Sequence, residues 1–167
     1  RAFGPYLLFD RIGRGGMAEI FLARRRTMEA GGGRRMVVKQ ILPELSENPQ
    51  FAAALVQEAK LAARLTHANV VQVFDLGEED IGPSQRLFIA MEYVEGLDLR
   101  ELLVRCSRER IPLPSEFAFL IVLETLRALD YAHRRCDDAG RALGIVHRDV
   151  SPSNVLLSLE GEVKLCD

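Results

Sequence analysis

Apolar residues gather in five short stretches of the first half of the chain. These stretches cover residues 6–12, 19–24, 35–42, 70–76 and 86–93, and they are rich in aromatic and β-branched side chains. This composition is typical of strands, and turn-forming residues separate most of the stretches. We therefore expect a five-stranded antiparallel sheet in this half of the molecule.

One helix is expected within the sheet-forming half. Asn48 is a suitable cap and Pro49 a suitable first residue for a helix that continues to about residue 65. Apolar residues at positions 51, 55, 62 and 65 share one helical face with Glu58. A buried carboxylate needs a cation, and Lys39, which lies between apolar neighbours on the third strand, is the candidate. The alternative is that Glu58 lies at the rim of this face, in contact with water.

The pattern changes from strands to helices near residues 92–96, which we interpret as a hinge. Residues 97–106 and 115–134 are expected to be helical, with Ser115 as the cap of the second helix. This second helix is apolar on most sides, which is typical of a helix buried on several faces. The chain is too short to cover all of it, so we expect part of the helix to stay uncovered. Residues 155–159 and 163–167 predict a hairpin. The fold class is therefore α+β, divided into residues 1–94 and 95–167.

Composition narrows the function. The chain has 167 residues and a formal net charge of -2, and its basic residues are mostly scattered, which does not favour a nucleic-acid-binding protein. No apolar stretch is long enough to span a membrane, and the N-terminus lacks the pattern of a signal peptide. Cys106, Cys136 and Cys166 lack metal-ligand spacing and predict neither a disulfide framework nor a zinc site. We therefore expect a cytoplasmic location. The chain is expected to be either a cytoplasmic protein or the cytoplasmic domain of a larger, membrane-anchored protein.

Glycines join the first two predicted strands. Gly13, Gly15 and Gly16 allow the backbone to approach a ligand closely and to direct N–H groups at anionic oxygens. The same letters fit a dinucleotide-binding loop, but that loop opens a helix, whereas a strand follows here. A P-loop is excluded because no Gly-Lys-Ser/Thr follows. By itself the stretch fits an ordinary hairpin equally well.

The strongest chemical pattern lies at residues 147–154. Asp149 and Asn154 are five positions apart on a segment that Pro152 keeps from being α-helical. Such an acid can face an attacking hydroxyl while the amide oxygen faces a metal. The following hairpin is expected to deliver Asp167 to the same place. Two carboxylates and an amide that converge indicate a site for a divalent cation and phosphate.

Taken in order, these features resemble the protein kinase superfamily. The string HRDVSPSN resembles the catalytic loop of this superfamily. The strings GRGGMA followed by EIFLA, and AMEYVEG, are most similar to bacterial Ser/Thr kinases of the eukaryotic (Hanks) type. The resemblance runs from the first strand to the aspartate of the D-F-G motif. It implies a kinase-like N-lobe of a five-stranded sheet and one long helix. The first helices and the catalytic-loop hairpin of a truncated C-lobe would follow.

The resemblance also implies roles for individual residues. Asp149 would orient the substrate hydroxyl, Lys39 paired to Glu58 would hold the α and β phosphates, and Asn154 with Asp167 would bind Mg²⁺. The backbone at positions 92 and 94 would bind adenine, position 91 would be the gatekeeper, and the aspartate at 98 would reach the ribose. The full set implied to contact ATP is Ile12, Gly13, Gly15, Gly16, Ile20, Val37, Lys39, Met91, Glu92, Val94, Asp98 and Leu156.

Two substitutions leave an alternative open. Ser151 stands where most Ser/Thr kinases of this family have a lysine near the transferred phosphate, and Ala18 replaces the third loop glycine. The main hypothesis is a kinase that transfers the γ-phosphoryl group of ATP to a protein Ser or Thr. The alternative is a nucleotide-binding pseudokinase that acts as a scaffold. We also expect the isolated chain to be weakly active or inactive and to self-associate through its uncovered helix.

Overall fold

The computed structural model describes residues 1–26, 33–81 and 84–167. These residues form two compact units, one of residues 1–64 and 72–93 and the other of residues 65–71 and 94–167. The sequence-based division at residue 94 therefore differs for Val94 and for the segment 65–71. Hydrogen bonds of Asn69 and Val71 to residues 163 and 165 hold this segment in the second unit.

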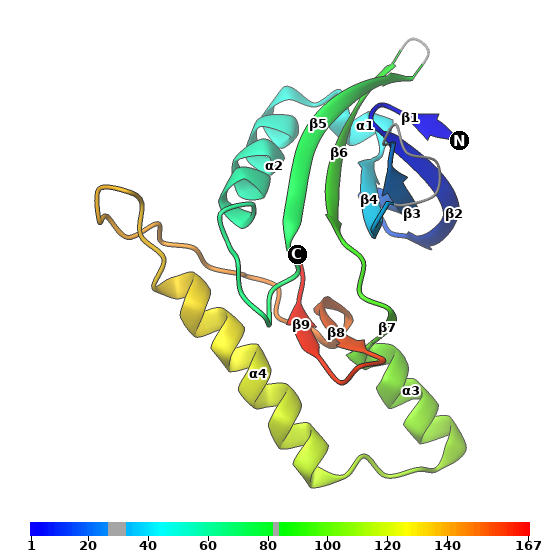
Figure 1. Cartoon of the computed structure of the whole chain (residues 1–167), viewed down its shortest axis with the longest axis vertical. Coiled ribbons are helices and arrows are strands. Elements are labelled where there is room, and N and C mark those ends of the chain that lie inside the picture. Colours follow the sequence, from blue (N-terminus) through cyan, green and yellow to red (C-terminus); the bar gives the residue numbers. More distant parts are fainter. Residues whose placement is uncertain (27–32, 82–83) are drawn as a thin grey trace. The chain divides into compact units, whose positions relative to one another are not determined.

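The first unit contains an antiparallel six-stranded sheet of order β1-β2-β3-β4-β6-β5 (Figure 1). The additional strand β1 is short, and it pairs with β2 because Gly4, at φ +48°, reverses the chain between them. Strands β5 and β6 extend further toward each other along the chain than the stretches 70–76 and 86–93 predict, and their connection at residues 82–83 lies outside the described residues. The strands are β1 (Ala2–Phe3), β2 (Tyr6–Arg14), β3 (Ala18–Arg25), β4 (Arg35–Ile41), β5 (Val73–Ile81) and β6 (Ser84–Glu92).

One face of this sheet carries the main apolar core of the first unit. Phe88 lies at its centre, with the ring of Phe3 at a centroid distance of 5.2 Å and the ring of Tyr6 at 5.6 Å, both edge-on. The other buried members of the cluster are Leu8, Ala23, Met36, Val38 and Ala90. Burial on this face fixes the register of the sheet, because a slip of one residue would expose the whole cluster.

The opposite face of the sheet packs against α1 (Pro43–Ser46) and α2 (Pro49–Ala62). The Asn48 side chain caps α2 by accepting hydrogen bonds from the backbone N–H groups of Gln50 and Phe51, as the sequence predicts. Figure 1 shows α2 lying along the sheet. The residues that α2 packs onto the sheet cluster are Phe51, Ala52, Leu55 and Val56, and Ala59 one turn further is buried.

The predicted position of Glu58 within the apolar face of α2 is wrong. Its side chain is exposed, because the helix is rotated so that Ala59 rather than Glu58 continues the buried face. At 100° per residue, Glu58 falls on the flank of that face. This position at the rim of the apolar face is the alternative stated from the sequence. Alanines are small and occur on buried and exposed faces, so the pattern could not decide between the two orientations of the helix.

The second unit contains a three-stranded sheet of order β7-β8-β9 with two helices and one 3₁₀ turn. The expected helix at 97–106 begins later because residues 96–98 pair with β8 as a strand. The second helix has Pro114 rather than Ser115 at its cap position, and no side chain caps it. The elements are β7 (Gly96–Asp98), α3 (Leu99–Glu109), α4 (Ser115–His133), η1 (Pro152–Asn154), β8 (Val155–Ser158) and β9 (Val163–Leu165).

Asn69 ties the segment 65–71 to the second unit. Its buried side chain donates from Nδ2 to the Val163 carbonyl oxygen at 2.9 Å, and its own carbonyl accepts from Leu165 N at 2.8 Å. Val71 N donates in turn to the Leu165 carbonyl at 2.9 Å. Buried polar groups that are fully paired in this way hold a loop firmly. The segment 65–71 therefore belongs to the same unit as β9, although helix α2 precedes it directly in the sequence.

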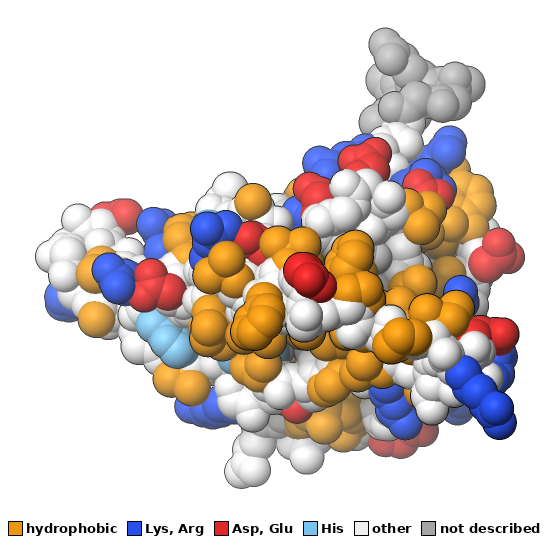
Figure 2. Space-filling model, turned by 90° about the horizontal axis from the view of Figure 1, so that it is seen from below, with side chains coloured by type: hydrophobic (Ala, Val, Ile, Leu, Met, Phe, Trp, Pro, Cys, Tyr) orange, Lys and Arg blue, Asp and Glu red, His pale blue; other side chains and the backbone are white. Residues whose placement is uncertain are grey.

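Helix α4 buries only a narrow part of its surface. Ile121 and Ala128 pack against Val155, Val163 and Leu165 of the hairpin. The prediction that this helix stays partly uncovered is therefore confirmed, and Figure 2 shows hydrophobic side chains gathered on one face of the molecule. Within the described residues, no helix has the length and apolarity needed to span a membrane. The exposed hydrophobic residues of α4 are Phe117, Phe119, Leu120, Val122, Leu123 and Leu126.

Candidate active site

The loop before β8 brings Asp149 and Asn154 into direct contact. Asn154 Nδ2 donates to the Asp149 carboxylate oxygen Oδ2 at 3.0 Å and to the Asp149 carbonyl oxygen at 2.9 Å. The 3₁₀ turn η1 makes this possible, because Asn154 N donates to the Ser151 carbonyl at 3.0 Å and Pro152 takes the first turn position, where it lacks no needed N–H. The acid and the amide, five positions apart in sequence, thus form one polar cluster.

His147 connects this loop to the end of the chain. Its Nδ1 accepts from Asp149 N at 3.3 Å, and its Nε2 lies 3.1 Å from the Cys166 carbonyl oxygen. A neutral imidazole that accepts at Nδ1 carries its proton on Nε2, so His147 donates to Cys166. The sequence pattern predicts no such role for His147. Its place two residues before Asp149 was the available signal, but the partner 19 residues away could not be read from the sequence.

Asp167 follows Cys166, whose backbone is hydrogen-bonded to the same loop. Cys166 N donates to the Asn154 carbonyl at 2.9 Å, so the residue after Cys166 leaves the hairpin beside Asn154. Both Arg148 (φ 65°) and Asp167 (φ 59°) have left-handed backbone conformations. For residues other than glycine this conformation costs energy and is common at functional sites. The loop thus brings Asp149 and Asn154 together and the hairpin returns the backbone beside Asn154, while the place of the Asp167 side chain at this site stays a prediction.

Asp98 and Leu156 are direct partners in the small sheet, because β7 pairs with β8 at these positions. Side chains of directly paired residues lie on the same side of a sheet, so the two predicted ATP contacts are neighbours. Asp98 also caps α3 by accepting from Glu101 N at 2.7 Å through Oδ1. This cap fixes the carboxylate and leaves Oδ2 for a ligand.

Four other predicted residues share one face of the large sheet. Ile20 pairs with Lys39 across β3 and β4, and Val37 pairs with Met91 across β4 and β6. Val37 and Lys39 are two residues apart on one strand, so all four side chains project to the same side. This side is opposite to the cluster around Phe88. These four of the residues predicted as ATP contacts are therefore gathered on one surface within the first unit.

The glycine loop closes the hairpin of β2 and β3 beside this surface. Gly15 N donates to the Ala18 carbonyl at 2.9 Å, and Gly13 pairs with Ile20. A Cβ atom placed on Gly15 or Gly16 would have no heavy atom within 4 Å, so the space over the loop is open. Ile12, just before the glycines, is exposed. The loop is thus able to admit a ligand without moving side chains aside.

Glu92, at the predicted hinge, ends strand β6, and its carboxylate makes polar contacts within the first unit. Its Oε2 accepts from Gln72 N at 3.3 Å, and its Oε1 lies 3.6 Å from Arg34. Its own N–H donates to the Gln72 carbonyl at 2.8 Å. The N–H group of Glu92 is therefore already used and is not available to a bound base. Val94, which was predicted to act with it, belongs to the other unit.

The predicted pairing of Lys39 with Glu58 does not occur among the described residues. Glu58 lies exposed on the flank of α2, whereas Lys39 is half-buried on the sheet. The rotation of α2 described above accounts for this difference. Lys39 itself is not without a partner.

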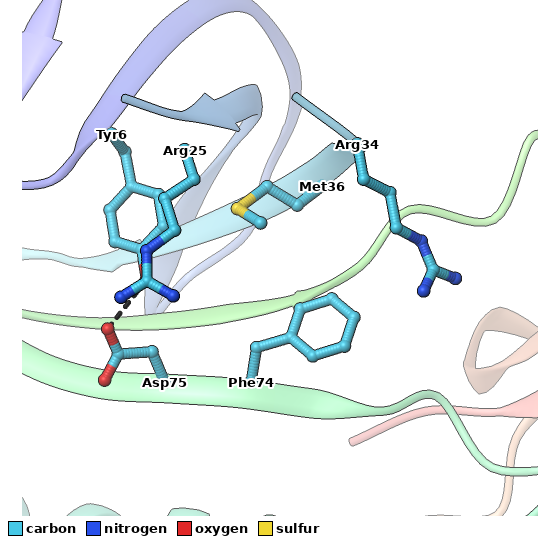
Figure 3. Close-up of a pocket in the computed structure, with 6 residues that line it drawn as sticks. All are labelled: Tyr6, Arg25, Arg34, Met36, Phe74 and Asp75. Carbon is cyan, nitrogen blue, oxygen red and sulfur yellow. Dashed lines mark hydrogen bonds between the residues drawn. The ribbon is translucent and has the colours of Figure 1, made fainter. Parts of the chain in front are cut away.

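A cavity of about 450 Å³ in the first unit contains none of the predicted site residues (Figure 3). Tyr6 forms part of its wall and donates to Asp75 Oδ2 at 2.7 Å. Burial, and then this hydrogen bond, raises the pKa of the Tyr6 hydroxyl above its ordinary value. Met36 and Asp75 share the sheet face of the Phe88 cluster, so the cavity lies on the side opposite to Lys39. Its remaining lining residues are Arg25, Arg34 and Phe74.

Comparison with known proteins identifies relatives of the whole chain. A family model described as protein kinase domain matches residues 6–167. Tyrosine-protein kinase MasK of Myxococcus xanthus is 39% identical over 165 residues, 99% of this chain and 25% of that protein. The probable serine/threonine-protein kinase SCO3848 of Streptomyces coelicolor is 40% identical over 167 residues, 100% of this chain and 22% of that protein. The chain thus spans about a quarter of the length of these curated relatives.

Solved structures agree with this assignment. The Mycobacterium tuberculosis PknI kinase domain matches with a TM-score of 0.77 and 31% sequence identity. The match covers 100% of this chain and 60% of that chain, so the described fold is part of a larger kinase fold. The α+β fold expected from the resemblance is confirmed, and the chain belongs to the protein kinase domain family.

Proposed function

We propose that this chain carries the nucleotide-binding and catalytic-loop parts of a Ser/Thr protein kinase that transfers the γ-phosphoryl group of ATP to a protein hydroxyl. The contact between Asn154 and the Asp149 carboxylate is the observation that carries the proposal. It fixes an acid and an amide oxygen in one cluster, as phosphoryl transfer requires. Residues 1–94 would form the ATP-binding lobe, and residues 95–167 would form the first part of the catalytic lobe.

Asp149 would orient the attacking hydroxyl and accept its proton. The hydrogen bond from Asn154 to Oδ2 leaves Oδ1 to face the substrate. His147 fixes the backbone of Asp149 through its Nδ1. A carboxylate that is held in this way loses little freedom when the hydroxyl binds, which favours a productive arrangement.

Asn154 and Asp167 are suitable ligands for Mg²⁺. Because Asn154 Nδ2 donates to Asp149, the amide oxygen Oδ1 is the atom left to face a cation. An amide oxygen and a carboxylate are hard ligands, and Mg²⁺ is commonly held by one or two protein groups together with substrate phosphates. The bound ion would neutralise negative charge on the phosphates.

ATP is the nucleotide that the predicted contact residues would bind. In the first unit, Gly13, Gly15 and Gly16 would direct N–H groups at the phosphates, and Lys39 would hold the α and β phosphates. Ile20 and Val37 would provide apolar contacts to the ribose and the base, next to the gatekeeper Met91. The remaining contacts would come from Ile12 and the hinge residues Glu92 and Val94, and from Asp98 and Leu156 of the small sheet.

The Lys39–Glu58 pair belongs to the active arrangement in this proposal. Glu58 is exposed in the described structure, so α2 would have to present this residue to the sheet before transfer. Ala59, which now occupies the buried face, is small and offers little resistance to such a rotation. Formation of the pair would place Lys39 for the phosphates.

Ser or Thr is the acceptor that the loop sequence favours. Pro152, Ser153 and Asn154 resemble the Ser/Thr form of the catalytic loop, although Ser151 replaces the lysine that usually accompanies it. The relative SCO3848 is named a serine/threonine kinase, whereas MasK is named a tyrosine kinase. Identification of the phosphorylated amino acid therefore tests the acceptor class separately from activity.

The proposal is tested with the intact protein that contains this chain, Mg²⁺ and γ-labelled ATP. We expect label to appear on Ser and Thr of a generic protein or of the kinase itself. A thermal shift with ATP, measured with and without Mg²⁺, reports binding independently of transfer. ATP binding without any transfer would contradict the kinase and favour a pseudokinase scaffold. Label on Tyr alone would overturn the acceptor class only.

A further inference from the structure

A second cavity, of about 410 Å³, lies in the second unit between the C-terminal end of α4 and the segment 65–71. None of its lining residues belongs to the predicted ATP or catalytic residues. The lining residues are His67, Arg127, Asp130, Tyr131, Arg134 and Arg135. Basic groups therefore dominate the lining.

Tyr131 organises this cavity. Its hydroxyl accepts a hydrogen bond from Thr66 N at 3.0 Å, and its ring stacks on His67 at a centroid distance of 4.8 Å. The guanidinium of Arg135 lies 5.4 Å from the centroid of the same ring. A planar guanidinium that rests on an aromatic ring keeps its N–H groups in a fixed direction. Arg135 is thus held in place rather than free in solvent.

Arg135 has an unmet hydrogen-bonding requirement. Its Nε is buried and has no hydrogen-bond partner among the described residues. A buried donor without an acceptor is destabilising, so an acceptor from outside the described residues is expected. His67 has a donor as well, because its Nδ1 accepts from Asn69 N at 3.1 Å and leaves the ring proton on Nε2.

The charges of the cavity favour an anion. Asp130 is paired with Arg134 at 2.7 Å, and Arg127 is paired with Glu124. Neither carboxylate is paired with Arg135 among the described residues. Three arginines against two carboxylates leave one positive charge in excess.

We propose that this cavity binds an oxyanion of phosphate chemistry, with Arg135 as the principal ligand and Arg127 and Arg134 as additional cations. A guanidinium matches the geometry of phosphate oxygens and can donate two parallel hydrogen bonds. The ligand is either free phosphate or the phosphate group of a phosphorylated side chain, since both present the same oxygens. The site stands on the cavity alone and does not depend on the proposed kinase activity.

Calorimetric titration of the intact protein with inorganic phosphate tests this site. We expect saturable binding that weakens as NaCl is raised, because the cavity is partly open to solvent. Arg135→Met should weaken binding about tenfold, the effect of one lost charge-assisted hydrogen bond. The double variant Arg127→Gln/Arg134→Gln, which changes only exposed side chains, should weaken it by a similar factor and remains informative if Arg135→Met fails to fold.

Arg108→Gln is the matched control, since Arg108 is also an exposed arginine paired with a neighbouring glutamate. It should leave phosphate affinity unchanged. A phosphoserine peptide that binds more tightly than inorganic phosphate would identify a phosphorylated side chain as the ligand, and equal affinity would identify the free anion. Absence of saturable phosphate binding, or equal binding in the cavity variants and the unmodified protein, would overturn the proposal.

Discussion

At the scale of single residues, hydrogen bonds from Asn154 and to His147 hold Asp149 in place within the loop of residues 147–154. The spacing of Asp149 and Asn154 predicted a shared site, and the structure brings the two side chains to 3.0 Å. The hydrogen bonds of His147 could not be predicted, because they depend on where β9 returns the chain. Glu58 was misplaced for a related reason, since neighbouring alanines made two helix orientations nearly equivalent. Local spacing was therefore informative, whereas contacts between distant segments were not.

Ser151 gives the first prediction at this scale. Ser151→Lys adds a cation to the loop, where it can stabilise charge on the transferred phosphoryl group. The residue has an extended backbone, and its carbonyl oxygen, not its side chain, accepts from Asn154 N, so lysine fits without disturbing the turn. We expect kcat for phosphoryl transfer to rise about tenfold, equivalent to roughly 1.4 kcal/mol. The KM for ATP should change little.

Ser153→Lys is the control for this experiment. Ser153 is exposed and lies within the same 3₁₀ turn, so the variant adds an equal charge two positions away. A steady-state assay with varied ATP separates kcat from KM. An equal rise in both variants would mean that added charge acts nonspecifically, and no rise in Ser151→Lys would refute a role for this position in charge stabilisation.

At the scale of elements, the strands, the helices and the hairpin of β8 and β9 were predicted well, whereas pairings between segments distant in the sequence were not. The two halves of the chain have distinct patterns, so the sheet of the first unit and the helix α4 (Ser115–His133) could be placed from sequence. The strand β7 (Gly96–Asp98) was missed because three residues carry no periodicity of their own. Pairing with β8 selects the strand conformation there. Asn69 holds the segment 65–71 to the hairpin through a hydrogen bond to Val163. No local sequence pattern predicts this contact, because the two residues are far apart in the chain.

Gly96 is the residue that permits the β7–β8 pairing. A Cβ atom at this position would lie 1.9 Å from the Leu157 carbonyl oxygen, which no small side-chain movement can relieve. Gly96→Ala should therefore destabilise the second unit by about 2–4 kcal/mol, as expected for a severe backbone clash. Urea denaturation of this chain measures the change.

Gly15→Ala provides the comparison, because a Cβ atom at Gly15 has no heavy atom within 4 Å. Its free energy of unfolding, measured without ATP, should stay within about 0.5 kcal/mol of the unmodified chain. If Gly96→Ala were equally neutral, the close approach of β7 and β8 would be refuted.

At the scale of the whole molecule, the main surface feature is the exposed apolar face of helix α4. Phe119 is 76% exposed, and Val122 and Leu126 follow it at helical spacing on the same side. Contiguous apolar patches of this kind mark surfaces that associate with other protein surfaces. Each unit has its own buried cluster, so the patch does not reflect a lack of core elsewhere.

The isolated chain should therefore self-associate. We expect sedimentation velocity to show a concentration-dependent shift to larger species, and the double variant Phe119→Gln/Leu126→Gln to reduce this shift. Phe9→Gln is the matched control, since Phe9 is 51% exposed on the other unit. A chain that sediments as a monomer at every concentration would contradict the prediction, as would an equal effect of the control.

Phosphoryl transfer by the intact protein tests the central claim most directly, with Asp149→Asn as the variant. The substitution keeps the size of the side chain but removes the carboxylate that would accept the hydroxyl proton. We predict that transfer from ATP falls by about a hundredfold to ten-thousandfold, the usual contribution of a general base. The matched variant Asp138→Asn, at an exposed aspartate of the same unit, should retain full activity. Equal transfer by Asp149→Asn and the unmodified protein would contradict the account.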